Sequence, residues 1–221
     1  MRLESVTSKT ERLLKEQLYR PDNKFFLAEL QDHHPPTYLH TLEVAKYAVS
    51  LGFELGLNSE QMDYLCRGAL RHDQGKTVIT TKLIDNPNKL AVWERYVMQV
   101  HVNEGFSSLR DFKPYKTPWQ VLEIVLKHHN YIKDGYPPEE KWRSLLNELP
   151  GYRPDPPGIT DLAAIVALAD MFEALLARRA YKEPKSLPEA RGIIQNEYTG
   201  PKTYINQMSK LILAYQGQLK I

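Results

Sequence analysis

The segment Tyr64–Thr80 reads YLCRGALRHDQGKTVIT, and it joins an apolar helical stretch to a group of charged and polar side chains. The helical pattern of apolar residues continues up to the adjacent pair His72 and Asp73. Gly75 and Lys76 follow, so the simplest interpretation is a polar helix end, with Gly75 as a left-handed cap and Lys76 facing the helix dipole. Many helices end in this way, so the rest of the chain must show whether the pair has a function.

The composition limits the kind of protein that this chain can form. It has 221 residues, of which 42% are hydrophobic, and can therefore bury the core of a single domain. The net charge is only +2, which is too small to favour the binding of long nucleic acids through phosphate neutralisation. The binding of a small anionic ligand is not excluded, because it needs only a local basic patch.

Cysteine usage and hydropathy favour a soluble cytoplasmic protein. Cys66 is the one cysteine and lies in an apolar helical run, which excludes a disulfide within the chain and favours an intracellular location. No apolar run approaches the ~18 residues of a membrane span. The first residues are charged where a signal peptide would be apolar.

The periodicity of the apolar residues predicts helices along most of the chain and no strand with strict alternation. We therefore expect an all-α fold. The predicted helices are Ser8–Leu18, Pro36–Leu55, Ser59–His72, Val92–Leu109, Pro118–Asn130, Glu139–Leu149, Thr160–Arg179, Leu187–Tyr198 and Lys202–Leu219.

The chain is interpreted as one helical bundle, residues 36–221, preceded by an N-terminal helical cap, residues 1–35. His33 and His34 stand before Pro35 and Pro36, which interrupt any helical register with His40. We therefore expect both of these histidines to lie outside any functional site. Apolar helix faces leave a homodimer open, and a signalling partner on a separate chain is a further alternative.

Five of the seven histidines and two aspartates lie on, or at the ends of, helical faces that should point into one core. A buried carboxylate is costly unless it is paired, hydrogen-bonded or bound to a metal. Imidazole and carboxylate together suit iron, manganese, nickel or zinc, and helical bundles build such sites from facing helices. The alternative is a set of unrelated caps and salt bridges. The candidate metal ligands are His40, His72, Asp73, His101, His128, His129 and Asp170.

Five motifs stand in an order and spacing that resemble the HD-GYP family, a subgroup of the HD superfamily of metal-dependent phosphohydrolases. The resemblance extends over residues 38–182, and the motifs are HTLEVAKYA, ALRHDQGK, VHVNEG, LKHHNYIKDGYP and ALADMFEALLARRAYK. It implies a helical HD domain with its metal centre in the core.

The resemblance also implies roles for individual residues. The first of two divalent metal ions, with iron or manganese favoured over nickel or zinc, would be held by His40, His72, Asp73 and Asp170. The second ion would be held by His101, His128 and His129, with Asp73 as a bridge. Asp73 and Lys76 would act in catalysis. The substrate would be contacted by Lys76, Arg179, Lys182 and Tyr136.

The activity implied is a phosphodiesterase that hydrolyses cyclic di-GMP to pGpG or GMP with a metal-bridged hydroxide as the nucleophile. The chain departs from the family pattern at Asn130, which replaces a glutamate, at a one-residue deletion before Gly135, and at Val78–Thr80. These differences keep two alternatives open. One is an HD phosphohydrolase that acts on another nucleotide or phosphoester, and the other is a non-catalytic nucleotide-binding signalling module.

Overall fold

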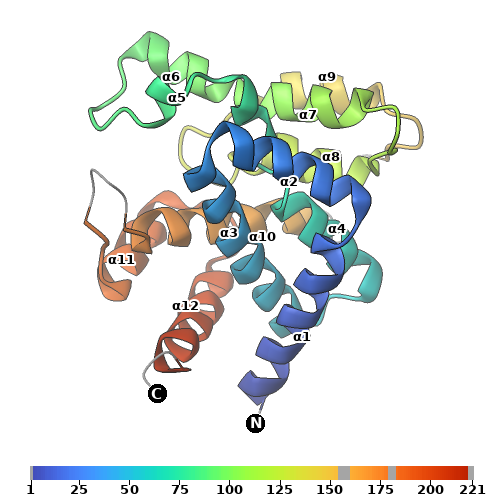
Figure 1. Cartoon of the computed structure of the whole chain (residues 1–221). Helices are drawn as coiled ribbons and strands as arrows, with labels where there is room; N and C mark the ends of the chain where they lie inside the picture. Colours follow the sequence, from blue (N-terminus) through green and yellow to red (C-terminus); the bar gives the residue numbers. More distant parts are fainter. Residues whose placement is uncertain (1, 154–159, 179–182, 219–221) are drawn as a thin grey trace.

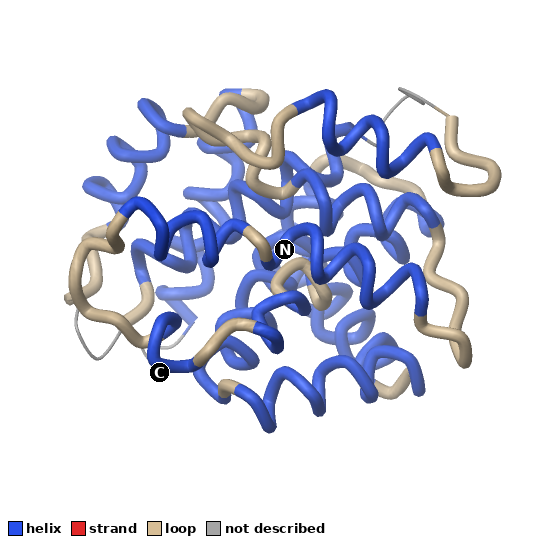
Figure 2. The backbone as a smooth tube through the Cα atoms, turned by 90° about the horizontal axis from the view of Figure 1, so that it is seen from above, coloured by secondary structure: helices blue, strands red, loops and turns tan. Residues whose placement is uncertain are grey.

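The computed structural model describes residues 2–153, 160–178 and 183–218, and these residues form an assembly of helices (Figures 1 and 2). The predicted all-α class is confirmed: the described part of the chain contains no strand beyond an isolated bridge between Ile132 and Tyr198. The elements are α1 (Arg2–Leu18), α2 (Pro21–His33), α3 (Pro35–Glu54), α4 (Ser59–Ala69), the short 3₁₀ helix η1 (Gln74–Val78), α5 (Thr81–Ile84), α6 (Val92–Gln99), α7 (His101–Asp111), α8 (Trp119–Lys127), α9 (Glu139–Asn147), α10 (Thr160–Leu176), α11 (Leu187–Glu197) and α12 (Lys202–Gln218).

Helix α3 is the central element of the bundle. It packs against α10 and α4, and also against α1, α2 and α12. Its core face is fully buried at Val44, Ala48 and Leu51, which recur at helical spacing. The apolar run of α10, from Leu162 to Ala169, is buried all round because several helices surround it.

A second, smaller core lies between α7, α8 and α9. Phe106, Leu126 and Leu146 belong to it, and Phe26 of α2 packs into the same cluster. In Figure 1, α7, α8 and α9 lie at the opposite end of the molecule from the two termini. Helix α8 contacts both α4 and α7, so it connects the two cores.

Helices α1 and α2 both pack on α3. Val6 belongs to the main core, and Leu30 is fully buried. Pro35 and Pro36 begin α3 rather than interrupting it, because a proline in the first turn gives up an N–H that has no helical partner.

Several predicted helices differ from the structure, and three of the differences lie beside candidate ligands. Pro118–Asn130 was predicted to include His128 and His129, but α8 ends at Lys127, and both histidines lie in the turn that follows. Val92–Leu109 was predicted as one helix, but the chain forms α6 and α7 with a break at Val100. Ser59–His72 was predicted to continue to the histidine, but α4 ends at Ala69, and His72 lies in the turn that follows. The break and the turns each place a candidate ligand at or just beyond the end of a helix.

None of the described helices combines the length and the apolar character that a membrane crossing requires.

Candidate metal centre

The seven predicted ligands come from five different parts of the bundle. His40 lies in α3 and Asp170 in α10, whereas His101 is the first residue of α7. His72 and Asp73 follow α4, and His128 and His129 follow α8. The ends of α4 and α8 meet because these two helices pack against each other.

The structure brings these side chains together as two adjoining groups. His40, His72 and Asp73 offer ligand atoms that lie within 4.8 Å of one another, and so do His101, His128 and His129. Asp170 lies beside the first group, with its Oδ1 3.2 Å from His40 Nε2.

Asp73 lies between the two groups. Its Oδ2 is 3.6 Å from His40 Nε2 and 3.5 Å from His72 Nε2, while its Oδ1 is 3.5 Å from His101 Nε2. Only 2% of this side chain is exposed. Each carboxylate oxygen therefore faces a different group of imidazoles.

Backbone carbonyls fix the orientation of three imidazoles. The Nδ1–H groups of His72, His101 and His128 donate to the carbonyls three residues earlier, at 2.8, 2.7 and 2.7 Å. A carbonyl accepts but cannot donate, so a neutral ring in this position carries its lone pair on Nε2. This is how the outer nitrogen of a metal-bound histidine is commonly held.

The Nε2 atoms show that these residues suit a cation. His101 Nε2 and His128 Nε2 lie 3.4 Å apart, with both lone pairs directed inward. His72 Nε2 is buried and, among the described residues, has no hydrogen-bond partner. Lone pairs that face one another in a buried site repel unless a proton or a metal ion lies between them.

In the second group, protonation does not readily relieve the repulsion between these lone pairs. Burial lowers the pKa of His101 to about 4 and that of His129 to about 3, and it also lowers the pKa of His128, with the neighbouring histidines adding to the effect for His128 and His129. These rings are neutral at pH 7. Neutral imidazole is the form that binds a metal ion.

The pKa of His40 is shifted in the opposite direction. Burial disfavours its charged form, but the carboxylates of Asp170, Glu173 and Asp73 outweigh burial and raise the pKa of His40 to about 9. Its Nδ1 forms a hydrogen bond with Glu173, and its Nε2 faces Asp170 and Asp73. Glu173 was not among the predicted site residues, although it stands three residues after Asp170 and therefore on the same side of α10.

Lys76 and Gly75 occupy η1, next to Asp73. Lys76 Nζ donates to Asp73 Oδ2 at 2.6 Å, and its side chain is partly exposed in the cleft described below. The predicted left-handed cap at Gly75 was wrong, because the glycines with positive φ among the described residues are Gly56 and Gly151. Gly75 is required for another reason: a Cβ there would lie 1.9 Å from the carbonyl oxygen of His101.

Tyr136 lies against the second group of histidines rather than alone in a loop. Its ring stacks on His129 with centroids 4.5 Å apart. Asn130, which departs from the family pattern, donates from its side-chain nitrogen to the carbonyl of Pro137 at 2.7 Å. The amide therefore ties down the shortened loop that carries Tyr136.

A cleft of about 560 Å³ opens beside the first group. Its lining includes His40, Lys76 and Glu173, so the candidate centre and the cleft share side chains. The predicted substrate residues Arg179 and Lys182 lie outside the described residues. Arg178, the residue before them, lines the cleft.

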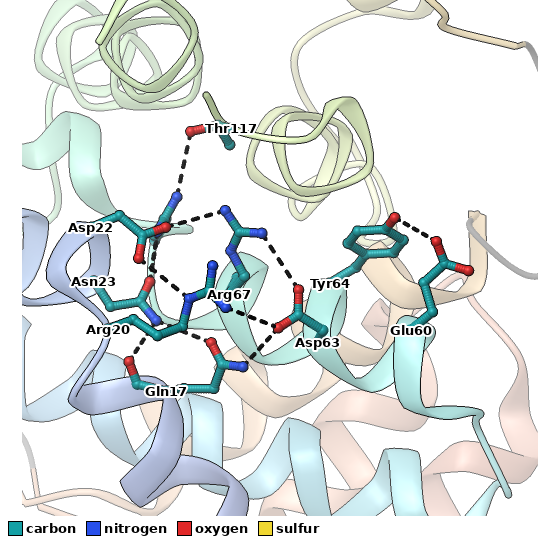
Figure 3. A network of polar contacts seen from close by, with 10 residues as sticks. Gln17, Arg20, Asp22, Asn23, Glu60, Asp63, Tyr64, Arg67 and Thr117 are labelled. Carbon is teal, nitrogen blue, oxygen red and sulfur yellow. Dashed lines mark hydrogen bonds and ion pairs between the residues drawn. The ribbon is translucent and has the colours of Figure 1, made fainter. Parts of the chain in front are cut away.

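A buried polar network supports the turn that carries His72 and Asp73. Arg71 is 1% exposed, and its guanidinium donates to Asp22 at 2.6 Å and to Asn23 at 2.7 Å. Figure 3 shows Asp22 and Asn23 of α2 facing Arg67 of α4 in this network. The turn is therefore attached to α2 directly before His72.

The family model and the similar proteins indicate the same family for this chain. The family model described as HD domain matches residues 37–175. A 3'3'-cGAMP-specific phosphodiesterase of Vibrio cholerae is 33% identical over 67% of this chain and 26% of its own length. A cyclic di-GMP phosphodiesterase of Thermotoga maritima is 33% identical over 74% of this chain and 40% of its own length. The chain thus spans about a quarter to two fifths of these relatives.

The fold is also similar to a solved structure. The HD domain of the Listeria monocytogenes phosphodiesterase PgpH matches with a TM-score of 0.59 and 19% identity, over 89% of this chain and 99% of that domain. The same domain in complex with cyclic-di-AMP matches with a TM-score of 0.59. The helical fold and the match of the family model over most of the chain lead to the same assignment: the chain belongs to the HD-domain family.

Proposed function

We propose that this protein is a metal-dependent phosphodiesterase of the HD-GYP subgroup that hydrolyses cyclic di-GMP to pGpG or GMP. Relatives named as phosphodiesterases of cyclic di-GMP and of 3'3'-cGAMP support the reaction class. The histidine and carboxylate donors support two divalent ions, with iron or manganese as the leading choice and nickel or zinc as alternatives.

One observation carries this proposal. The two oxygens of Asp73 face imidazoles of two different groups, so one carboxylate can serve two ions. We assign His40, His72 and Asp170 to the first ion, and His101, His128 and His129 to the second. Paired ions are a common solution for phosphoester hydrolysis.

The bound ions would supply an activated water and charge neutralisation at the phosphate. The chain's own residues would do the rest. Lys76 extends from η1 into the cleft, where its ammonium group can neutralise charge on the phosphate oxygens. Arg178 lines the same cleft and offers a planar pair of donors to a second phosphate. Glu173 and the backbone carbonyls hold the imidazoles in place.

The experiment combines metal analysis with a substrate panel on protein purified without oxygen. We expect about two ions per chain and hydrolysis of cyclic di-GMP, whereas mononucleotides should remain intact. Hydrolysis of mononucleotides without hydrolysis of any cyclic dinucleotide would reject the proposed substrate class. Nucleotide binding without any hydrolysis would contradict the proposal that the protein is an enzyme.

Asp73→Ala tests the shared ligand. We expect this variant to lose both ions and activity, because Asp73 faces both groups. His33→Ala is the control, since His33 bonds the carbonyl of Ile79 and is not among the candidate ligands. Equal metal content in Asp73→Ala and the parent protein would contradict the shared-ligand assignment.

A further inference from the structure

Asp85 is a carboxylate of the cleft that the proposed reaction does not use. Three carboxylates line this cleft: Glu43, Glu173 and Asp85. Glu43 pairs with Lys46 at 3.1 Å, and Glu173 holds His40. The Asp85 side chain is 60% exposed, and its Oδ1 contacts Nε2 of His34 at 3.0 Å. Among the described residues, none forms a hydrogen bond with its second oxygen, so this oxygen can accept a hydrogen bond from a ligand.

His34 fixes the position of Asp85. The backbone N–H of Thr37 donates to His34 Nδ1 at 3.2 Å, so this nitrogen is an acceptor and the ring proton lies on Nε2. Nε2–H therefore donates to Asp85 Oδ1. His34 is only 6% exposed, and it is held as the N-cap of α3. Pro35 and Pro36 were expected to separate it from any functional site, but they begin α3, and His34 lines the cleft. A buried, oriented imidazole thus presents an exposed carboxylate to the cleft.

The surroundings of Asp85 suit a flat base. Leu39, Ile84 and Met98 supply apolar surface in the same cleft, and Lys76 supplies positive charge on the side of the metal centre. Apolar walls with a small number of placed polar groups are typical of small-molecule sites. A nucleotide could therefore place its phosphate near Lys76 and its base near Asp85.

We infer that Asp85 recognises guanine in the substrate and that His34 is its positioning residue. This inference rests on the proposed function. Guanine carries two adjacent donors, N1–H and the N2 amino group, which match the two oxygens of one carboxylate. Adenine presents N1 as an acceptor in that place, so its lone pair would face Asp85. A carboxylate held in this orientation therefore favours guanine over adenine.

The test compares hydrolysis of cyclic di-GMP and cyclic-di-AMP by the metal-loaded full chain. Asp85→Asn replaces one acceptor by a donor, which suits N1 and the N6 amino group of adenine. We expect the ratio of kcat/KM for the guanine substrate over the adenine substrate to fall by about 10- to 100-fold, the size of one good bidentate contact to a base. Asp32→Asn makes the same charge change at an exposed position of α2 outside the cleft, and should keep the parent ratio.

His34→Asn tests the positioning role without removing the helix cap. Asparagine is a strong N-cap and can still accept from Thr37 N–H, but it is too short to hold Asp85. We expect a lower guanine preference, measured as the same ratio of kcat/KM values, with a Tm close to that of the parent protein. If Asp85→Asn hydrolyses both substrates in the parent ratio, the inference is wrong while the proposed function stands. If the parent protein hydrolyses neither substrate, the proposed function fails and the inference fails with it.

Discussion

At the scale of single residues, the centre depends on how each imidazole is held. His72, His101 and His128 are oriented by carbonyls of their own chain segments, so the local turn is sufficient. His40 differs because its Nδ1 partner, Glu173, comes from another helix. The first group of ligands therefore depends on the packing of α3 against α10.

Glu173→Gln should weaken metal binding without removing a ligand. The amide keeps the shape of the side chain but loses the charge that orients His40 and increases its basicity. We expect metal affinity to fall by about 10- to 100-fold, the usual effect of changing such a partner. A metal titration measures this change, and Glu16→Gln, at an exposed position of α1, is the control. An unchanged affinity would show that Glu173 does not position His40.

The candidate ligands could be predicted from the sequence because each lies on or beside a helix with a clear apolar face. His40 shares its helix with Val44 and Leu51, and both of these are fully buried. The position of Glu173, three residues after Asp170, could have indicated that it lies beside the site, but its pairing with His40, 133 residues away, leaves no local pattern. The pairing of Asp85 with His34, 51 residues away, leaves none either.

At the scale of elements, the contact between η1 and α7 brings the two groups of ligands together. Gly75 lies against the backbone of α7 at His101 and Gly105. A side chain at residue 75 would meet rigid backbone on the other side of the contact. The close approach therefore requires glycine, although its φ angle does not.

Gly75→Ala should separate η1 from α7. The new Cβ would lie 1.9 Å from the His101 carbonyl oxygen and 2.5 Å from Gly105 N, so backbone must move. We expect a loss of stability of about 3 kcal/mol or more, together with weaker metal binding. Gly192→Ala is the matched control: its Cβ meets nothing within 4 Å, and alanine in α11 should stabilise by about 0.5–1 kcal/mol. Denaturant unfolding measures both variants, and equal stability of the two would contradict the contact.

Helix boundaries show where sequence patterns are insufficient. No helix was predicted between Leu18 and Pro36, yet α2 occupies Pro21–His33 and buries Phe26 and Leu30. The buried side of α2 includes the polar residues Asp22 and Asn23 as well as apolar ones. The sequence therefore shows no clear apolar face for this helix. These polar residues are buried because they bind Arg71, which lies far away in the chain.

Asp22→Ala should break the attachment of α2 to the turn before His72. Burial opposes the charge of Asp22, but Arg71 and Arg67 lower its pKa overall, so the pair is charged at neutral pH. Removing the carboxylate leaves the guanidinium of Arg71 buried without its ion-pair partner. We expect a loss of about 3–5 kcal/mol, against less than about 1 kcal/mol for Glu139→Ala, which breaks an exposed pair with Arg143. Chemical denaturation distinguishes the two, and a similar small loss in both would show that the network adds little.

At the scale of the whole molecule, folding gathers imidazoles of two kinds into one centre. His40 binds a proton more tightly in the folded chain than in the unfolded chain, whereas His101 and His129 bind one less tightly. Both kinds of shift link proton binding to folding, but with opposite signs. A metal ion replaces the extra proton of His40 and binds the neutral rings of the second group, so it should change the pH dependence of stability as well as its magnitude.

Metal-free protein should be most stable near pH 6.5. The raised pKa of His40, about 9 against 6.5, adds stability that is fully present below pH 6.5 and is lost as pH rises to about 9. The pKa values of His101 and His129 are lowered to about 4 and 3 in the folded chain. As pH falls below 6.5, the unfolded chain binds protons at these histidines while the folded chain does not, so the folded state loses stability. His128 acts in the same direction, so the acid side should be steeper than the alkaline side. Thermal unfolding in a chelator between pH 5 and pH 9 measures the curve. With metal bound, His40 is neutral and the decline above pH 6.5 should disappear; a stability that rises steadily to pH 9 in the metal-free protein would contradict the ion pairing of His40.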